Sequence, residues 1–261
     1  MRKLNALKTS TAPVVAALAL CLLAAAISLH AANPQAGTQT VSYPSGTETV
    51  SGYLALPGSG KHPALIVIHE FWGLNDWVKD EAQKFAAQGY VVLAVDLYRG
   101  KVATTPDEAH ELMRGVPEDR AARDLEAAFA YLAARPDVDA GKIGVVGWCM
   151  GGGYSIRFAV SEPKLAACIV NYGPLPTDPT NIAKIKAPVM GNFGADDRGI
   201  TPASVQAFDA AMKAAGKSVD VKEYDGAGHA FENPNNKDGY RPAATADAWT
   251  RMTAFLKKAL Q

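Results

Sequence analysis

The chain has 261 residues, 48% hydrophobic and 20% charged, which is enough for one sizeable core but short for two. Its 26 basic and 26 acidic residues balance, which excludes a strongly basic nucleic-acid binder and an acidic disordered tail, so no nucleic-acid partner is expected. Three scattered cysteines exclude a disulfide scaffold and a paired-cysteine zinc site.

Residues 1–32 have the layout of a secretory signal peptide. Three basic residues precede an apolar run, Ala12–Leu29, small residues follow it, and no acidic residue occurs before Glu48. Cleavage after Ala31 or Ala32 fits this layout, although neither gives a clean small-x-small pair. An uncleaved membrane anchor is the alternative, because roughly 20 apolar residues span a bilayer.

Cleavage would leave a mature chain, residues 33–261, with 23 basic and 26 acidic residues, a net charge of −3. We expect one domain and a monomer, exported to the periplasm or secreted, with no membrane contact after cleavage. Two cysteines remain, Cys149 and Cys168.

The mature chain begins with two alternating segments, Thr38–Tyr43 and Glu48–Ala55, which predict an N-terminal β-hairpin. Beyond it the pattern changes to short, almost continuous apolar runs, typical of strands buried on both faces: Ala64–Ile68, Tyr90–Val95, Ile143–Trp148, Ala166–Asn171, Pro188–Phe193 and Val219–Tyr224.

Amphipathic segments of helical length separate these runs: one from Asn75 or Asp76 to Gly89, one from Pro117 to before Pro136, Gly151–Val160, Pro202–Ala215 and Arg241–Leu260. Strands that alternate with helices predict an α/β fold, with a mainly parallel central sheet and helices on both faces. The segments Gly100–Pro117 and Gly173–Lys186 carry no readable motif and are expected to be loops.

The strongest local signal is Gly147-Trp148-Cys149-Met150-Gly151, where a predicted strand leads into a predicted helix. This is the nucleophile-elbow pattern with cysteine in the place of serine. Glycines two residues away on either side allow strand and helix to approach, and the helix N-terminus favours a thiolate. Cys168 lies within an apolar run without such a context, so we interpret it as a core residue.

A nucleophile of this kind needs a base and an acid, which follow it in the order acid, histidine. His229, in the loop after the last predicted strand, is the only histidine beyond Cys149. Asp197 follows the strand Pro188–Phe193 at the same sheet edge, and we choose it as the acid. Asp196 and Asp225 remain alternatives.

Four segments together carry a resemblance to a known family: His69-Glu70-Phe71-Trp72-Gly73-Leu74-Asn75, Asp96-Leu97-Tyr98, Gly147-Trp148-Cys149-Met150-Gly151-Gly152 and Gly228-His229-Ala230-Phe231. From about Gly52 to the C-terminal helix, the chain is similar to the dienelactone hydrolases, a cysteine-nucleophile branch of the α/β-hydrolases. The resemblance implies an α/β-hydrolase fold over residues 33–261.

By position, the resemblance implies Cys149 as the nucleophile, His229 as the base and Asp197 as the residue that orients His229. It implies an oxyanion hole formed by the backbone N–H groups of Phe71 and Met150.

Glu70 is the family's additional carboxylate, placed to contact the cysteine in the resting enzyme and to help move its proton.

The substrate-binding positions match the family less well. Its dienelactone-cleaving members hold a substrate carboxylate with two arginines, one just after Asp-Leu-Tyr and one four residues beyond the histidine. Here Arg99 comes one residue early and Asn233 occupies the second position. We therefore expect a substrate other than dienelactone, with Arg99, Trp72 and Trp148 as candidate substrate contacts.

These residues predict hydrolysis of a small carboxylic ester or lactone through a thioester on Cys149, with no metal and no organic cofactor. A thioesterase or acyl transferase could use the same three residues. A non-catalytic exported binding protein is the alternative from another class, although no member of the predicted triad is missing.

Overall fold

The computed structural model describes Met1 and residues 36–261. The predicted signal peptide, residues 1–32, and its alternative as a membrane anchor therefore lie outside the described residues, apart from Met1. Within the described part of the chain, no helix has both the length and the apolar character needed to cross a bilayer.

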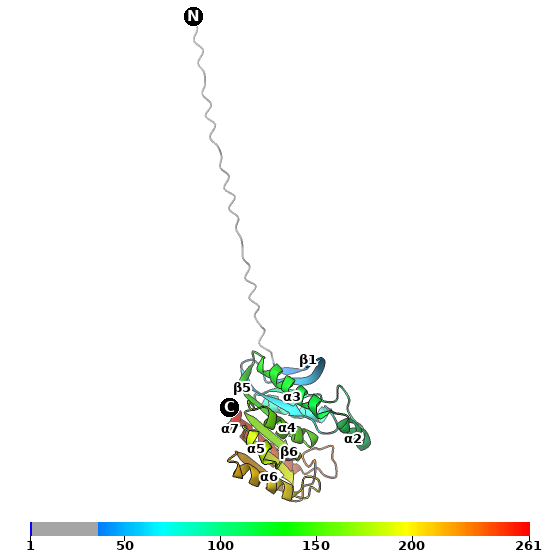
Figure 1. Cartoon of the computed structure of the whole chain (residues 1–261). Helices are drawn as coiled ribbons and strands as arrows, with labels where there is room; N and C mark the ends of the chain where they lie inside the picture. The colour runs from blue at the N-terminus through cyan, green and yellow to red at the C-terminus, as the bar shows by residue number, and fades with distance from the viewer. Residues whose placement is uncertain (2–35) are drawn as a thin grey trace. The chain divides into compact units, whose positions relative to one another are not determined.

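The core of the fold is one eight-stranded sheet with the strand order β1-β2-β4-β3-β5-β6-β7-β8 (Figure 1). Its strands are β1 Gly37–Ser45, β2 Glu48–Leu56, β3 His62–Ile68, β4 Val91–Val95, β5 Val138–Trp148, β6 Ala167–Asn171, β7 Val189–Gly194 and β8 Val219–Tyr224. β1 and β2 form the predicted hairpin, β2 pairs antiparallel with β4, and every later pairing is parallel. The predicted α/β-hydrolase fold, mainly parallel with an N-terminal hairpin, is confirmed.

Helices cover both faces of the sheet, because parallel strands that are buried on both sides need an apolar layer on each. They are α1 Asp76–Ala87, α2 Pro106–Arg114, α3 Glu118–Ala133, α4 Met150–Ser161, α5 Pro179–Lys184, α6 Pro202–Ala214 and α7 Pro242–Leu260. α1 and α7 pack on one face. α3, α4, α5 and α6 pack on the other, and Figure 1 shows them in front of the sheet.

Two segments predicted as loops contain helices. α2 begins after Thr105, whose side chain accepts from the Glu108 backbone N–H, but Ala109 is its only buried residue, so no apolar periodicity marks it. α5 begins after Asp178 in the same way and has six residues, of which one is buried. Short helices held by caps more than by packing leave little hydrophobic pattern in a sequence.

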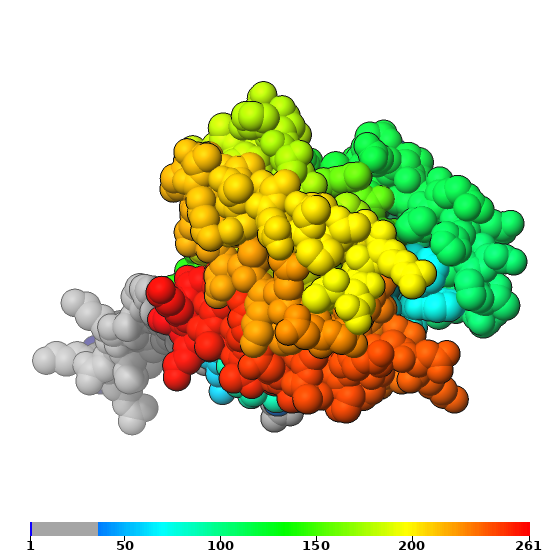
Figure 2. Space-filling model, turned by 90° about the horizontal axis from the view of Figure 1, so that it is seen from below, coloured from blue at the N-terminus to red at the C-terminus, as the bar shows by residue number. Residues whose placement is uncertain are grey.

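Two close approaches place the start of α4 against the ends of β3 and β5. A Cβ atom on Gly147 would overlap the backbone of Gly151, and one on Gly151 would overlap the carbonyl of Ile68. The loops that follow the strands meet at this edge. Figure 2 shows the yellow segment after β7 against the orange segment after β8, and the cyan segment after β3 beside green α2.

Candidate active site

Cys149 lies at the turn between β5 and α4, in a backbone conformation that residues other than glycine rarely adopt. Its φ is 54° and its ψ is −118°. The turn is held because the Cys149 N–H donates to the Asn171 carbonyl at 3.0 Å and the Gly153 N–H donates to the Cys149 carbonyl at 3.1 Å. The half-buried sulfur therefore projects at the positive end of a 12-residue helix.

His229 and Asp197 continue from Cys149 in one line of hydrogen bonds. The His229 Nε2 lies 3.1 Å from the Cys149 sulfur, and the His229 Nδ1 lies 2.7 Å from an Asp197 carboxylate oxygen. The Asp197 carboxylate is buried, whereas the two alternative acids, Asp196 and Asp225, are exposed. Within residues 36–261, neither alternative hydrogen-bonds to His229. Side chains joined in this order can supply a nucleophile, a base and an acid that orients the base.

The pKa values of His229 and Asp197 support an ion pair between these two side chains at neutral pH. Burial acts to lower the pKa of His229, but its hydrogen bonds with Asp197 and Cys149 outweigh burial and raise it to about 10. Burial acts to raise the pKa of Asp197, but hydrogen bonds from His229 and from the backbone N–H groups of Ile200 and Gly199 lower it. The raised pKa of His229 and the lowered pKa of Asp197 together favour an imidazolium–carboxylate ion pair.

Two backbone N–H groups near Cys149 are free to bind a ligand oxygen. Met150 is the first residue of α4, and Phe71 lies in the loop after β3. Neither N–H donates to any protein acceptor within residues 36–261. Free amides from the residue after the nucleophile and from the loop after the third strand are what an oxyanion hole on this fold requires.

Glu70 is a buried carboxyl next to this line, with neutral partners. The Tyr172 hydroxyl donates to one oxygen at 3.0 Å and the Asn233 amide donates to the other at 2.7 Å. Burial raises the pKa of Glu70 to about 7, although the two hydrogen bonds and the charge of His229 oppose the shift. Within the described chain Glu70 forms no hydrogen bond with Cys149, so the direct contact that the resemblance implies is absent in this state.

Comparison with known proteins shows which family the chain belongs to. The model of the dienelactone hydrolase family matches residues 50–260. The chain belongs to the dienelactone hydrolase family.

Relatives that match most of this chain agree with this assignment. "Putative carboxymethylenebutenolidase" of Methylorubrum extorquens is 31% identical over 80% of this chain and 77% of its own. "Protein usf" of Aquifex pyrophilus is 35% identical over 85% of this chain and 99% of its own. The crystal structure of a "Putative Dienelactone Hydrolase" from Klebsiella pneumoniae is 28% identical, with a TM-score of 0.78, over 86% of this chain and 99% of its own. This dienelactone hydrolase-like protein is therefore a hydrolase.

Two of the three predicted substrate contacts lie elsewhere in this member of the family. Arg99 makes a two-pronged ion pair with the buried Asp124 and also binds Glu48 at 3.0 Å, so its guanidinium is already occupied. The Trp148 indole is 1% exposed and packs edge-on against Trp77, so it is a core side chain. Both side chains are therefore committed to contacts within the protein.

The third predicted contact, Trp72, lies beside the site. Its ring lies 4.6 Å from that of Phe71, and the His110 ring of α2 lies 5.2 Å from Phe71 on another side. Because Phe71 and Trp72 are only half-buried, part of each side chain is accessible to a ligand.

Sequence reasoning assigned no structural role to three residues that hold the site. Tyr172 and Asn233 bind Glu70, and Glu232 accepts from the Trp148 indole N–H at 2.9 Å. Tyr172 directly follows the apolar run that forms β6, and a polar residue at the end of a parallel strand is a usable signal. Glu232 and Asn233 directly follow the Gly228-His229-Ala230-Phe231 segment. Their closeness in sequence to His229 is the signal that could have identified a role for both.

Glu232 lies below the nucleophile elbow, at a cavity of about 260 Å³ between α1 and α7 that Glu81 and Trp249 also line. The residue is 5% exposed. Burial raises the pKa of Glu232 to about 8, because the one hydrogen bond from Trp148 does not compensate for the lost hydration.

The described residues also bear on metal binding. Within residues 36–261, no three His, Cys, Asp or Glu side chains are grouped so that they could hold a metal ion.

The buried Glu232 predicts a pH dependence of stability. Between its ordinary pKa of 4.5 and the folded value of about 8, the folded protein holds a proton that the unfolded chain has released. The free energy of unfolding therefore falls as the pH rises through this range. In Glu232→Gln the fall is smaller, as measured by urea unfolding between pH 4.5 and 8.5. Glu126→Gln, at an exposed position on α3, is the control and keeps the parent's slope. Equal slopes in Glu232→Gln and the parent would contradict the assignment.

Proposed function

We propose that the protein hydrolyses a small carboxylic ester or lactone through a Cys149-His229-Asp197 triad. The observation that carries the proposal is the continuous line of hydrogen bonds, 3.1 Å from His229 to the sulfur and 2.7 Å from His229 to Asp197, at a strained strand-helix turn. The names of its carboxymethylenebutenolidase relatives support a lactone or ester as the substrate.

The first half of the reaction forms a thioester. The Cys149 thiolate attacks the substrate carbonyl carbon, and the negative charge that develops on its oxygen is bound by the N–H groups of Phe71 and Met150. As the intermediate collapses, the bond to the alcohol oxygen breaks and His229 gives its proton to that oxygen. In a lactone the released alcohol stays attached to the acyl group.

The second half consumes water. His229, now neutral, takes a proton from a water molecule that attacks the thioester carbonyl, and the acid leaves as the thiolate is restored. Asp197 holds the imidazole in the required orientation throughout, because its oxygen binds the Nδ1 and leaves the Nε2 facing the sulfur. Glu70, with a pKa of about 7, is placed to exchange a proton in this region at neutral pH.

The triad predicts which cysteine is required. In Cys149→Ala, turnover of a small aryl ester falls at least about 1,000-fold, because the nucleophile is gone. Cys168→Ala is the matched control: this thiol is fully buried in β6, so the variant loses stability but keeps its activity. In the mature chain, residues 33–261, iodoacetamide labels one cysteine, Cys149. Retention of esterase activity in Cys149→Ala would refute the proposal.

The environment of the site favours an uncharged acyl group. Arg99 is held by Asp124 and Glu48, and the neutral Asn233 replaces the second arginine of the family's dienelactone-cleaving members. The Asn233 amide donates to the buried carboxyl of Glu70 at 2.7 Å. An anionic substrate would lose hydration here and meet a carboxyl in place of a cation.

Two esters of the same alcohol and the same acyl length, with and without a terminal carboxylate, test this inference. We expect kcat/KM for the neutral ester to be at least about tenfold higher, corresponding to about 1.4 kcal/mol. The comparison is made at low and high salt, because a remote surface charge would lose its effect at high salt and a buried site would not. Equal or faster turnover of the anionic ester would show that another cation binds the carboxylate.

We also propose that the enzyme is exported and acts as a monomer after removal of residues 1–32. The basic start, the apolar run and the small residues after it support export. Expression of the full chain in a Gram-negative host is expected to place active protein in the periplasm, with a mass that corresponds to a cut at Ala31 or Ala32. Recovery of the uncut chain in the membrane fraction would instead identify an anchor.

A further inference from the structure

The two amides that would form the oxyanion hole come from separate parts of the chain. Phe71 lies in the loop after β3, whereas Met150 begins α4. Secondary structure alone therefore does not fix the distance between the two backbone N–H groups. One side chain touches both residues. The Tyr98 hydroxyl lies 3.1 Å from the Phe71 carbonyl oxygen and 3.3 Å from the Met150 sulfur.

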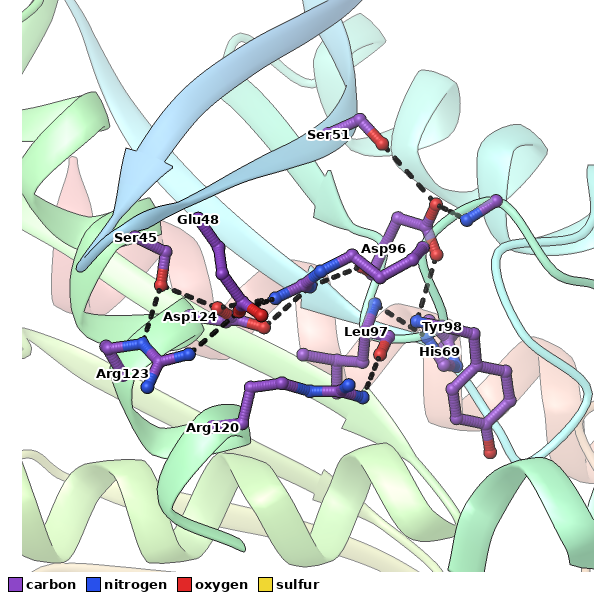
Figure 3. Close-up of polar contacts among 12 residues, drawn as sticks. Ser45, Glu48, Ser51, His69, Asp96, Leu97, Tyr98, Arg120, Arg123 and Asp124 are labelled. Atoms are coloured by element: carbon purple, nitrogen blue, oxygen red, sulfur yellow. Dashed lines mark hydrogen bonds and ion pairs between the residues drawn. The ribbon is translucent and has the colours of Figure 1, made fainter. Parts of the chain in front are cut away.

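Tyr98 is itself fixed from several directions. Its ring packs edge-on against that of His69 at 4.7 Å, and its backbone N–H donates to the Asp96 carboxylate at 3.1 Å. The other oxygen of Asp96 accepts from the backbone N–H of Gly100 and from the Ser51 hydroxyl. Figure 3 shows Asp96 between Ser51 and Tyr98, with the Tyr98 ring directed away from the carboxylate.

The neighbouring residues of the same loop are also tied down. The Leu97 N–H donates to His69 Nε2 at 3.3 Å, and Arg99, with a φ of 56°, is held by its ion pair with Asp124. These contacts join the loop after β4 to β3, to α3 and to the N-terminal hairpin (Figure 3). A loop fixed at so many points can hold the Tyr98 hydroxyl in one place.

We propose that Tyr98 is a positioning residue that sets the spacing and orientation of the Phe71 and Met150 amides. The inference rests on the proposed function, since it assigns Tyr98 to the oxyanion hole of that reaction. Tyr98 is 4% exposed, and burial raises the pKa of its phenol, so the hydroxyl stays protonated and able to donate. It donates its single proton to the Phe71 carbonyl or shares it with the Met150 sulfur.

Loss of the hydroxyl is expected to affect the transition state more than substrate binding. The oxyanion acquires its full charge only as the tetrahedral intermediate forms, and removal of one of its donors outright costs about 100- to 1,000-fold in kcat. Misplacement of the donors costs less. For Tyr98→Phe we expect kcat to fall about 10- to 100-fold, with KM changed less than about twofold.

Three measurements on the mature protein separate this role from a general structural one. The first is kcat and KM with a neutral aryl ester. The second is the affinity of a simple alkyl aldehyde, which adds to Cys149 as a hemithioacetal and places an oxygen in the hole. The third is the rate of alkylation by iodoacetamide, which needs the thiolate but no oxyanion hole. In Tyr98→Phe, aldehyde affinity falls with kcat and the alkylation rate stays within about twofold.

Tyr43→Phe is the matched control, because the Tyr43 hydroxyl is buried and has no hydrogen-bond partner within the described residues. It leaves all three measurements unchanged. Met150→Leu removes the sulfur but keeps the amide, and it is expected to lower kcat and aldehyde affinity less than Tyr98→Phe does. This second variant keeps the proposal testable if Tyr98→Phe folds poorly.

Unchanged aldehyde affinity in Tyr98→Phe and Met150→Leu would overturn the proposal. So would an alkylation rate that falls as far as kcat, because Tyr98 would then act on the sulfur. Failure of the proposed function has a different signature: the parent hydrolyses no ester, or Cys149→Ala keeps its activity. Aldehyde binding and alkylation report on Tyr98 even when no ester is turned over.

Discussion

The site depends on the strained turn at Cys149, and the turn depends on close packing that only glycine permits. Because Gly147 and Gly151 have no Cβ, α4 can begin directly against the ends of β3 and β5. This contact holds the start of α4 against the carbonyls of Ile68 and His69, and it leaves the Cys149 sulfur 3.1 Å from His229 Nε2. A positive φ at a cysteine costs about 1–3 kcal/mol, and the surrounding strand pairings maintain it.

The pKa values of three buried carboxyls, Asp197, Glu70 and Glu232, shift in different directions because their hydrogen-bond partners differ. Asp197 binds His229 and two backbone N–H groups, which outweigh its burial and keep it ionised. Glu70 has the neutral donors of Tyr172 and Asn233, and Glu232 has the neutral indole of Trp148, so burial prevails and their pKa values rise. Asp197 is therefore held as a carboxylate beside His229, whereas Glu70 in the site and Glu232 in the cavity between α1 and α7 have pKa values raised toward neutral pH.

Most of the fold, and the residues of the candidate triad, could be predicted because they follow local rules. Continuous apolar runs mark strands buried on both faces, and the elbow pattern identifies Cys149 by its spacing alone. Contacts between distant segments leave no such mark. The bond from Trp148 to Glu232 joins residues far apart in sequence, and the role of Tyr172 depends on a carboxyl contributed by the loop after β3. Packing also turned Trp148, an aromatic residue beside the nucleophile, away from the site.

Arg99 shows how a shift of one residue changes the role of a side chain. The resemblance suggests a substrate-binding arginine just beyond the loop after β4, but Arg99 occupies a left-handed position and reaches the N-terminal hairpin and α3. Its ion pair with the buried Asp124 helps to fix the loop that carries Tyr98. With Arg99 turned inward and Asn233 neutral, Glu70 has no cationic side chain among its hydrogen-bond partners, which is why burial can raise its pKa to about 7. The neutral amide of Asn233 therefore binds a buried carboxyl that titrates near neutral pH.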